Sequence, residues 1–577
     1  MTLLAEPAAA TRVVSRWNWW RRAWDLPVWA HLLALTAILL LLVPVVGTSQ
    51  SFLADEGAAM IQARSLEAGD GWIVEHPLPQ VDPEGAWYPV INAEHGERGA
   101  APLAKHPAYP LLAAAAARLG GVTGIVLLSL AGTIAAAGLA AALARRIDTS
   151  LVRPSVWVVG LASPMLFDGF LAMAHTLGAA LAAAAILAAV VSVQDRRPAV
   201  ALLVIPPVAG AVLLRNEALL FAAALVVVAA AIAVCRPWRV PAALVAASAL
   251  FAAVGARLVE RVWIAAITGG AVSATAVGVP AAEDSFVRGR IDGFTMTWLT
   301  PGYGGSPVLV VAMLVMLVAV AWCGLRVRRR PDDRTGIVGS AAVAAGAAVV
   351  ALVIAPDNVV PGLLFAFPVA TAGMVALHRR LFDDVGMVVI GATATLFALA
   401  VIATQYSIGG SGEWGGRYFA LVIPVVVPLF LAALRRQGRS LLPSVRRYVA
   451  TALVVCSVAL SVMAVNALRV SHRGKAALVA RIEEAGRVTG DGRPVVVTSW
   501  IGASRVAWPT FEDHRWLYVP DGEVATASAR LRAVGVERFV FVASEPDAAR
   551  RQLAGLKIIA SEPSPDARGR QILVLES

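Results

Sequence analysis

The stretch WAHLLALTAILLLLVPVVGTSQSFLADEGAAMIQARSLEAGDGW, residues 29–72, contains the features that decide the fold. It opens with an apolar run from Trp29 to Val46 that carries no Lys, Arg, Asp or Glu. A run of this length and composition is typical of a transmembrane helix. Two adjacent carboxylates, Asp55 and Glu56, follow directly, and a helical pattern continues to Ala68. The sequence therefore predicts a membrane span that leads into an acidic helix outside the bilayer.

The composition of the whole chain points the same way. Hydrophobic residues make up 58% of the 577 residues and charged residues only 15%, whereas a soluble domain has about 25% charged residues. We predict a polytopic α-helical membrane protein with about thirteen spans. Their approximate limits are 27–47, 122–143, 154–170, 174–193, 199–214, 218–234, 240–264, 307–325, 337–355, 360–377, 385–404, 418–434 and 448–468.

The net charge of +11 is distributed as in a membrane protein and not as in a nucleic-acid-binding protein. With the N-terminal segment 1–26 in the cytoplasm, every even-numbered junction also falls inside, and these junctions hold most of the arginines. They carry Arg145, Arg146, Arg196, Arg197, Arg236, Arg239, the run 326–330, Arg379, Arg380 and the run 435–447. We therefore expect a multi-pass protein of the cytoplasmic (plasma) membrane with its N-terminus inside and its C-terminal domain outside.

The chain divides into three predicted parts. The cytoplasmic segment 1–26 precedes a membrane domain, 27–470, with a long outer loop at 48–109. From residue 471 the composition becomes that of a soluble protein, and strand patterns alternate with helical ones, which predicts a small extracytoplasmic α/β domain, 471–577. The expected strands are 494–499, 516–519, 538–543, 557–561 and 571–575, and the expected helices are 524–534 and 547–553. The three cysteines, which lie in or beside apolar spans, predict neither a disulfide framework nor a metal site.

The acidic pair Asp55-Glu56 has two interpretations. Asp and Glu are common in the first turn of a helix, where they interact favourably with the helix dipole. The other interpretation is chemical, and it comes from a resemblance. The pattern from Asp55-Glu56 to Gly69-Asp70-x-Trp72, with the later segment from Lys105 to Leu112, resembles the first outer loop of GT-C membrane glycosyltransferases, closest to the aminoarabinose-transferase and protein O-mannosyltransferase group.

The resemblance implies a GT-C-like fold and a mechanism. Such enzymes transfer a sugar, with inversion, from a polyprenyl-phosphate donor to a hydroxyl or amine, here on a cell-envelope glycan, glycolipid or protein. Asp55 matches the catalytic Asp, which acts as general base, and Glu56 would support it. Lys105 matches the Lys that stabilises the leaving phosphate. Its alternative is a snorkelling interface residue.

Two arginines resemble further elements of the family. Arg215 lies in Leu-Arg-Asn-Glu, where relatives have Arg-Pro-Glu, and the resemblance implies that it binds the donor phosphate. Its alternative role is an ion pair with Glu217. Arg417 lies in Gly-Gly-Arg-Tyr before a late span, so we expect donor-phosphate contact there, the alternative being an interface anchor.

Other residues of the predicted site have less definite roles. His106, Tyr109 and Tyr418 are expected to contact the acceptor or the loop. The family often has a second acidic residue in the next outer loop, where this chain has Asp168 and, in the expected place, His175. We therefore assign both a supporting role.

Cofactors and other classes of function stay open. The first loop holds Glu75, His76, Glu94, His95, Glu97 and His106, and their spacing matches no closed metal site, so a divalent metal is only a minor alternative. A transporter or lipid flippase would need charges at mid-membrane, whereas the predicted charges gather at the outer mouth. A non-catalytic envelope-binding protein would make Asp55 and Lys105 replaceable.

Overall fold

The computed structural model describes residues 24–90, 93–103, 105–270, 273–274, 285–301, 306–355, 359–405, 410, 412–543, 557–563 and 571–576. Within this part of the chain, nine helices are long and apolar enough to cross a membrane. They are α2 (Val28–Val46), α4 (Ala108–Ile147), α7 (His175–Gln194), α10 (Arg239–Thr268), α12 (Pro307–Arg329), α13 (Arg334–Ile354), α16 (Val385–Thr404), the segment Arg417–Gly438 that contains α17 (Ile423–Gly438), and α18 (Pro443–Thr489). The protein is thus a multi-pass membrane protein, as predicted.

The remaining predicted spans are shorter or interrupted helices. Segment 199–214 is a 3₁₀ turn followed by α8 (Ile205–Leu214), and segment 218–234 is α9 (Glu217–Ala233). Segment 154–170 contains α5 (Val152–Leu161) and α6 (Met165–Asp168), and segment 360–377 contains α14 (Leu363–Ala366) and α15 (Pro368–Ala376). Pro164 and Pro368 stand where the second helix of each pair begins, and a proline cannot continue the hydrogen-bonding of a preceding helix.

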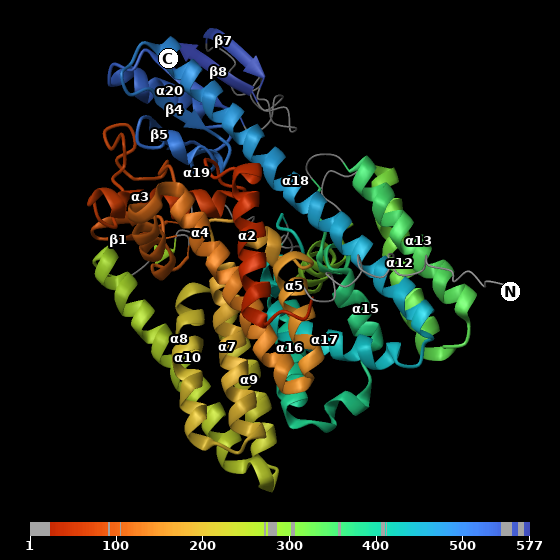
Figure 1. Cartoon of the computed structure of the whole chain (residues 1–577). Coiled ribbons are helices and arrows are strands. Elements are labelled where there is room, and N and C mark those ends of the chain that lie inside the picture. The colour runs from red at the N-terminus through yellow and green to blue at the C-terminus, as the bar shows by residue number, and fades with distance from the viewer. Residues whose placement is uncertain are drawn as a thin grey trace, which may run out of the picture.

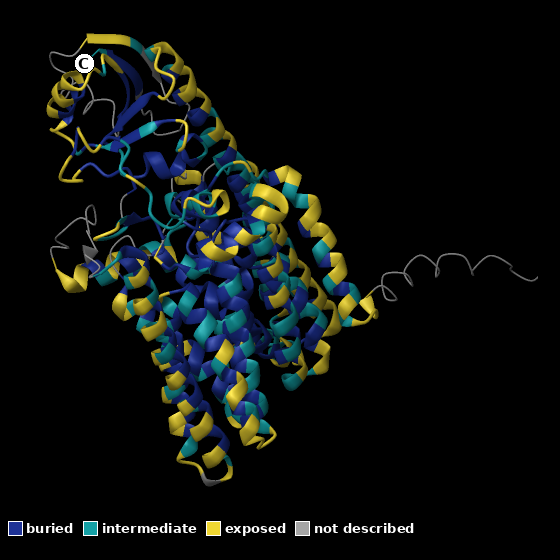
Figure 2. Cartoon of the chain, turned by 90° about the vertical axis from the view of Figure 1, so that its left-hand side faces the viewer, coloured by how far each residue is buried: buried dark blue, intermediate teal, exposed yellow. Residues whose placement is uncertain are grey.

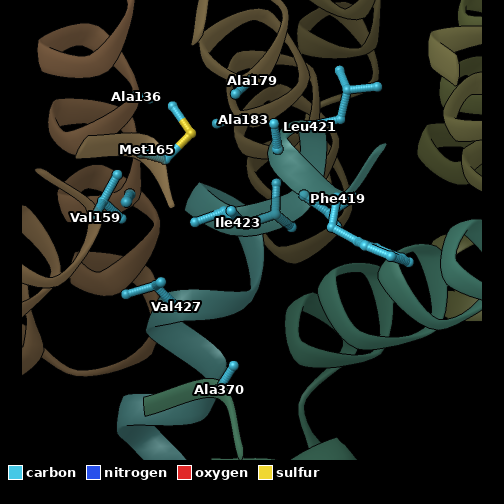
Figure 3. Packing of buried hydrophobic residues seen from close by; sticks show 14 of the residues in the cluster. Ala136, Val159, Met165, Ala179, Ala183, Ala370, Phe419, Leu421, Ile423 and Val427 are labelled. Atoms are coloured by element: carbon cyan, nitrogen blue, oxygen red, sulfur yellow. The ribbon is translucent and has the colours of Figure 1, made fainter. Parts of the chain in front are cut away.

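Small side chains hold the membrane helices close together. Gly132 of α4 has no room for a Cβ, because the side chain of Thr176 and the backbone of Leu177 on α7 lie against it. Figure 3 shows Ala136 of α4 and the α7 residues Ala179 and Ala183 near larger side chains such as Met165. Helices in a bilayer associate through this close van der Waals packing, since lipid offers no hydrophobic driving force between them.

The first outer loop is folded. Helix α3 (Ala54–Ala68) follows α2 after a short turn, and strands β1 (Glu94–Gly96) and β2 (Gly99–Ala101) form an antiparallel hairpin to which β3 (Ser273–Ala274) adds. Helix α4 begins at Ala108, well before the predicted span at 122, and has non-helical backbone at Gly120 and Gly121. The kink separates an outer part of α4, packed on α3, from its membrane part.

The C-terminal unit, residues 495–576, contains a five-stranded sheet of order β5-β4-β6-β8-β7. Strands β4 (Val495–Thr498), β5 (Arg515–Tyr518) and β6 (Arg538–Val542) are parallel, and β7 (Lys557–Pro563) and β8 (Gln571–Glu576) are antiparallel. Helices α19 (Ala503–Val506) and α20 (Val524–Ala533) lie between strands. All five predicted strands are present, and the predicted helix at 547–553 lies outside the described residues.

The C-terminal unit covers the first outer loop. Helix α18 runs unbroken from the membrane helices to the sheet, across the predicted boundary at 471, and Figure 1 shows the unit above α3. Leu78, Val81 and Trp87 of the loop belong to the apolar core of the sheet, and the backbone N–H of Tyr518 donates to the carbonyl of Trp87. In Figure 2 most of the strands are dark blue, that is, buried, whereas the loop beneath them is partly exposed. Loop and sheet therefore fold as one layer over the same end of the bundle.

Candidate active site

Asp55 lies in the first turn of α3, where the C-terminal unit meets the membrane helices. Three cationic side chains from distant parts of the chain surround its carboxylate. Asp55 Oδ2 lies 3.1 Å from Arg417 Nη1 and 3.8 Å from Lys105 Nζ, and Oδ1 lies 3.4 Å from Arg505 Nη1. The Asp55 side chain keeps 25% of its surface exposed, so the carboxylate is held by cations yet open to a small molecule.

The charges decide the protonation state of Asp55. Burial alone raises its pKa, because a charged carboxylate is poorly solvated there. The positive charges of Lys105, Arg417 and Arg505 outweigh burial and hold the pKa of Asp55 well below its usual range. Asp55 is therefore an ionised carboxylate at neutral pH.

Glu56, the neighbour of Asp55, does a different task. Its Oε1 accepts hydrogen bonds from the backbone N–H groups of Phe52 and Leu53, each at 2.8 Å, and its Oε2 accepts one from Ala172 at 2.8 Å. The side chain is buried, and burial raises its pKa to about 7 although those hydrogen bonds lower it. Glu56 thus caps the start of α3 and ties it to the loop before α7.

A chain of charged side chains leads from Arg417 into the bundle. Glu413 Oε1 lies 3.3 Å from Arg417 Nη1, and Glu413 Oε2 lies 2.9 Å from His175 Nε2. Nε2 of His175 also lies 2.8 Å from Arg215 Nη1, and Arg215 Nε lies 3.2 Å from Glu217 Oε2. Arg215 therefore has the ion pair that its neighbour in the sequence suggests, and it also contacts His175.

Asp168, on α6, is a further carboxylate of this region. It is buried, and its Oδ1 accepts no hydrogen bond from the described residues. Its charged neighbours include Glu413 and Arg215. The structure thus brings Asp168 and His175 into one electrostatic neighbourhood with Arg215 and Glu413.

Lys105 and His106 are consecutive residues that point to different partners. Lys105 has a backbone φ of +90°, which is rare for a residue with a side chain, and its amino group faces Asp55. His106 is buried and its Nδ1 makes a short hydrogen bond with Glu260 of α10, which Arg257 also contacts. His106 thus anchors the loop to α10, away from Asp55, and this anchor fixes the backbone turn that presents Lys105.

Tyr109 and Tyr418, the two tyrosines of the predicted site, are both buried. Tyr109 packs in the apolar cluster between α3 and α4, and its hydroxyl has no hydrogen-bond partner among the described residues. The ring of Tyr418 lies under the guanidinium of Arg417, 5.4 Å from centroid to Cζ. Tyr418 therefore supports Arg417 through a cation–π contact.

Each histidine of the first loop contacts a side chain near it. His76 Nε2 lies 3.1 Å from Asp82 Oδ2, and the His95 ring packs edge-on against Tyr88. In the described part of the chain, no group of three or more His, Cys, Asp or Glu side chains is arranged to hold a metal ion. The three cysteines are free.

Two residues of the site have no role in the sequence-based prediction. Glu413 lies just before the Gly-Gly-Arg-Tyr segment and four residues before Arg417, a spacing that suits an ion pair. Arg505 lies 450 residues from Asp55 in the chain, in the C-terminal unit, where the sequence shows no recognisable motif. Only the folded chain shows that it belongs here.

Comparisons with known proteins give a fold. No family model matches the chain, and no curated protein does. The apo structure of ArnT from Cupriavidus metallidurans aligns with 94% of this chain and 97% of its own, at 13% identity and a TM-score of 0.51. ArnT bound to undecaprenyl phosphate aligns over the same shares of the two chains, with a TM-score of 0.49. The oligosaccharyltransferase AglB from Archaeoglobus fulgidus aligns with 91% of this chain and 70% of its own, at 13% identity and a TM-score of 0.48.

The match to apo ArnT extends over the membrane helices and the C-terminal unit alike. ArnT is an aminoarabinose transferase, a member of the group that the segments around Asp55 and Lys105 resemble. Sequence motif and three-dimensional arrangement, which are independent observations, thus agree: the chain has the fold of the GT-C membrane glycosyltransferases.

Proposed function

We propose that the protein is an inverting membrane glycosyltransferase that takes a sugar from a polyprenyl-phosphate donor. The observation that carries the proposal is the ionised Asp55 carboxylate, partly open and ringed by Lys105, Arg417 and Arg505. A base and a set of cations at one opening are what sugar transfer from a lipid phosphate needs. The ArnT of Cupriavidus metallidurans, which shares the fold, is also known bound to undecaprenyl phosphate, and this supports a donor of that class.

The reaction would be a single displacement. The acceptor oxygen or nitrogen attacks the anomeric carbon and gives its proton to Asp55, while the bond from that carbon to the phosphate oxygen breaks. The lipid phosphate leaves with its full charge, and Lys105, Arg417 and Arg215 would stabilise it. Attack and departure on opposite faces of the sugar invert the anomeric centre.

The donor phosphate would also prepare the base. Arg417 and Lys105 pair with Asp55 Oδ2. A phosphate that binds these two cations competes with Asp55 for them, so the pKa of Asp55 rises towards the range of a useful base. Binding of the donor and activation of Asp55 are then one event.

The basic junctions support the predicted orientation. Arg146 pairs with Asp195 and Arg435 pairs with Asp148, all at the end of the bundle away from Asp55. Arginine-rich ends of spans stay in the cytoplasm, so Asp55, α3 and the C-terminal unit would face outward. The acceptor is then a cell-envelope glycan, glycolipid or protein at the outer face of the plasma membrane.

The test uses the purified protein in nanodiscs with radiolabelled polyprenyl-phosphate mannose, arabinose, glucose or galactose and an envelope extract as acceptor. We expect transfer from one donor and a loss of about 10³-fold in Asp55→Asn, within the range of general-base catalysis. Asp195→Asn, an ion-paired aspartate at the opposite end, is the matched control and should keep the parent rate. Undiminished transfer in a folded Asp55→Asn protein would reject Asp55 as the base and direct attention to Asp168 and His175.

A further inference from the structure

Among the residues that the structure describes, the segment from Thr498 to Arg505 brings the C-terminal unit to the candidate active site. Parallel strand β4 ends at Thr498, and the chain then turns through Trp500 into α19. Ligand sites in open α/β sheets lie beyond the carboxyl ends of the parallel strands. Here the carboxyl end of β4 faces the first turn of α3, and Ala54, next to Asp55, packs with Trp500 against the apolar cluster that contains Ala503.

Helix α19 is fixed in place by contacts on both sides. At Gly57 of α3 an added Cβ would overlap the backbone carbonyl of Arg505, so the two backbones touch. Ser504 donates a short hydrogen bond to the carbonyl of Pro89 in the first loop, and the guanidinium of Arg64 lies over the ring of Trp508, 5.1 Å from its centroid. The position of Arg505 relative to Asp55 is therefore set by packing.

The Arg505 side chain is buried and held at both ends of its guanidinium. Nη2 donates to the carbonyl of Ile501 in its own turn at 3.3 Å, and Nη1 donates to Asp55 Oδ1 at 3.4 Å. The other carboxylate oxygen, Oδ2, faces Arg417 and Lys105 of the membrane domain. The two oxygens of Asp55 are thus divided between the two parts of the molecule.

We propose that Arg505 is a positioning residue of the active site, which the C-terminal unit supplies to hold Asp55 Oδ1 while Oδ2 accepts the proton of the acceptor. The inference rests on the proposed role of Asp55 as general base. When a donor phosphate takes Arg417 and Lys105, Oδ2 loses its partners and the carboxylate would be free to rotate. Arg505 prevents this rotation, because its own position does not depend on the donor.

A positioning role predicts a different kinetic effect for Arg505 than for the cations that bind the donor. Loss of Arg505 should lower kcat and leave the donor KM nearly unchanged, since Arg417 and Lys105 still bind the phosphate. A misplaced catalytic group costs about 10- to 100-fold in rate. A simple interdomain ion pair would lower stability without this separation of kcat from KM.

The experiment compares Arg505→Met, Arg505→Lys and Arg515→Met with the parent in nanodiscs. Arg515 pairs with Asp491 in the same unit, away from Asp55, and is the matched control. We expect a fall in kcat of about 30-fold in Arg505→Met with a donor KM within about twofold of the parent, partial recovery in Arg505→Lys, and no change in Arg515→Met. Unchanged kcat in Arg505→Met, or equal effects at Arg505 and Arg515, would overturn the proposal.

The double variant with Asp55→Asn separates the two proposals. If Arg505 acts through Asp55, Arg505→Met should not reduce the residual rate of Asp55→Asn any further, and a further reduction would contradict the inference alone. If Asp55→Asn keeps full transfer, it is the proposed base that fails. A second measurement, which needs no transfer activity, is the unfolding temperature of the parent, Asp55→Asn, Arg505→Met and the double variant. We expect the effects of the two changes to be coupled, and additive effects would contradict a contact between Arg505 and Asp55.

Discussion

The two ends of the helix bundle carry the same kinds of charged residues but bury them to different extents. Helix α7 connects them: His175, at its start, belongs to the charged chain behind Asp55, and Gln194, at its end, donates to Asp384 at 2.9 Å. At the Asp55 end, the side chains of Arg417 and Arg505 are only 12% and 7% exposed. At the other end, Arg146 and Asp195 are each 30% exposed.

Under the proposed function, the buried charges act in the reaction and the exposed charges set the orientation of the protein in the membrane. Exposed ion pairs contribute about 0–1 kcal/mol, since water screens them, and their main effect is to fix the side of the membrane on which they stay. Buried charges act on one another through a lower dielectric, so each one changes the protonation and position of its neighbours. The predictions that follow compare matched residues from the two ends.

The largest expected difference in transfer rate is between variants of Arg417 and of Arg435. Each of these arginines pairs with an aspartate, Arg417 at the Asp55 end and Arg435 at the opposite end. Arg417→Met should lower kcat/KM for transfer by about 100-fold, because it removes a donor to the leaving phosphate. Arg435→Met should stay within about twofold of the parent. The measurement is the donor-transfer assay, with Arg417→Lys as a variant that keeps the charge beside Glu413. Similar losses in both Met variants would mean that burial does not separate the two ends.

A smaller effect is expected from the pH dependence of stability at Glu56. Burial raises its pKa in the folded protein from 4.5 to about 7. The folded state therefore holds the proton more tightly than the unfolded state, and this contribution is complete below pH 4.5 and lost as the pH rises through about 7. Between pH 5 and pH 8 the parent should lose a few degrees of unfolding temperature more than Glu56→Gln does.

The control for this titration is Glu67→Gln at the exposed end of the same helix, which should keep the pH slope of the parent. Only the slopes are compared, because Gln at position 56 also replaces one oxygen that accepts a backbone N–H. Equal slopes of unfolding temperature against pH for the parent and Glu56→Gln would show that Glu56 does not titrate between pH 5 and pH 8.

Local patterns in the sequence were sufficient for the features that depend on neighbouring residues. The spans follow from apolar runs, the strands of the C-terminal unit from alternating patterns, and Asp55 and Lys105 from short motifs whose side chains do lie together. The interrupted segments 154–170 and 360–377 show the limit of hydropathy, since it does not register the breaks at Pro164 and Pro368.

Contacts between distant segments could not be predicted in this way. His106 was expected to contact the acceptor or the loop, but the sequence could not name its partner in the structure, Glu260, which lies on a helix 154 residues further on. Arg505 reaches Asp55 only because Gly57 lets α19 approach α3. No periodicity or motif encodes such an approach, which depends on how the sheet packs on the first loop.

The smallest effect is expected at Asp148, which has strong local contacts at the exposed end. Hydrogen bonds from Ser150 and the charge of Arg435 lower its pKa to about 2, so this contribution to stability is present above the ordinary value of 3.8 and lost only as the pH falls towards 2. Asp148→Asn should therefore leave transfer within about twofold of the parent and lower the unfolding temperature slightly, by the same amount at pH 5 and pH 8. A large loss of transfer in Asp148→Asn would contradict the separation between the Asp55 end of the bundle and the opposite end.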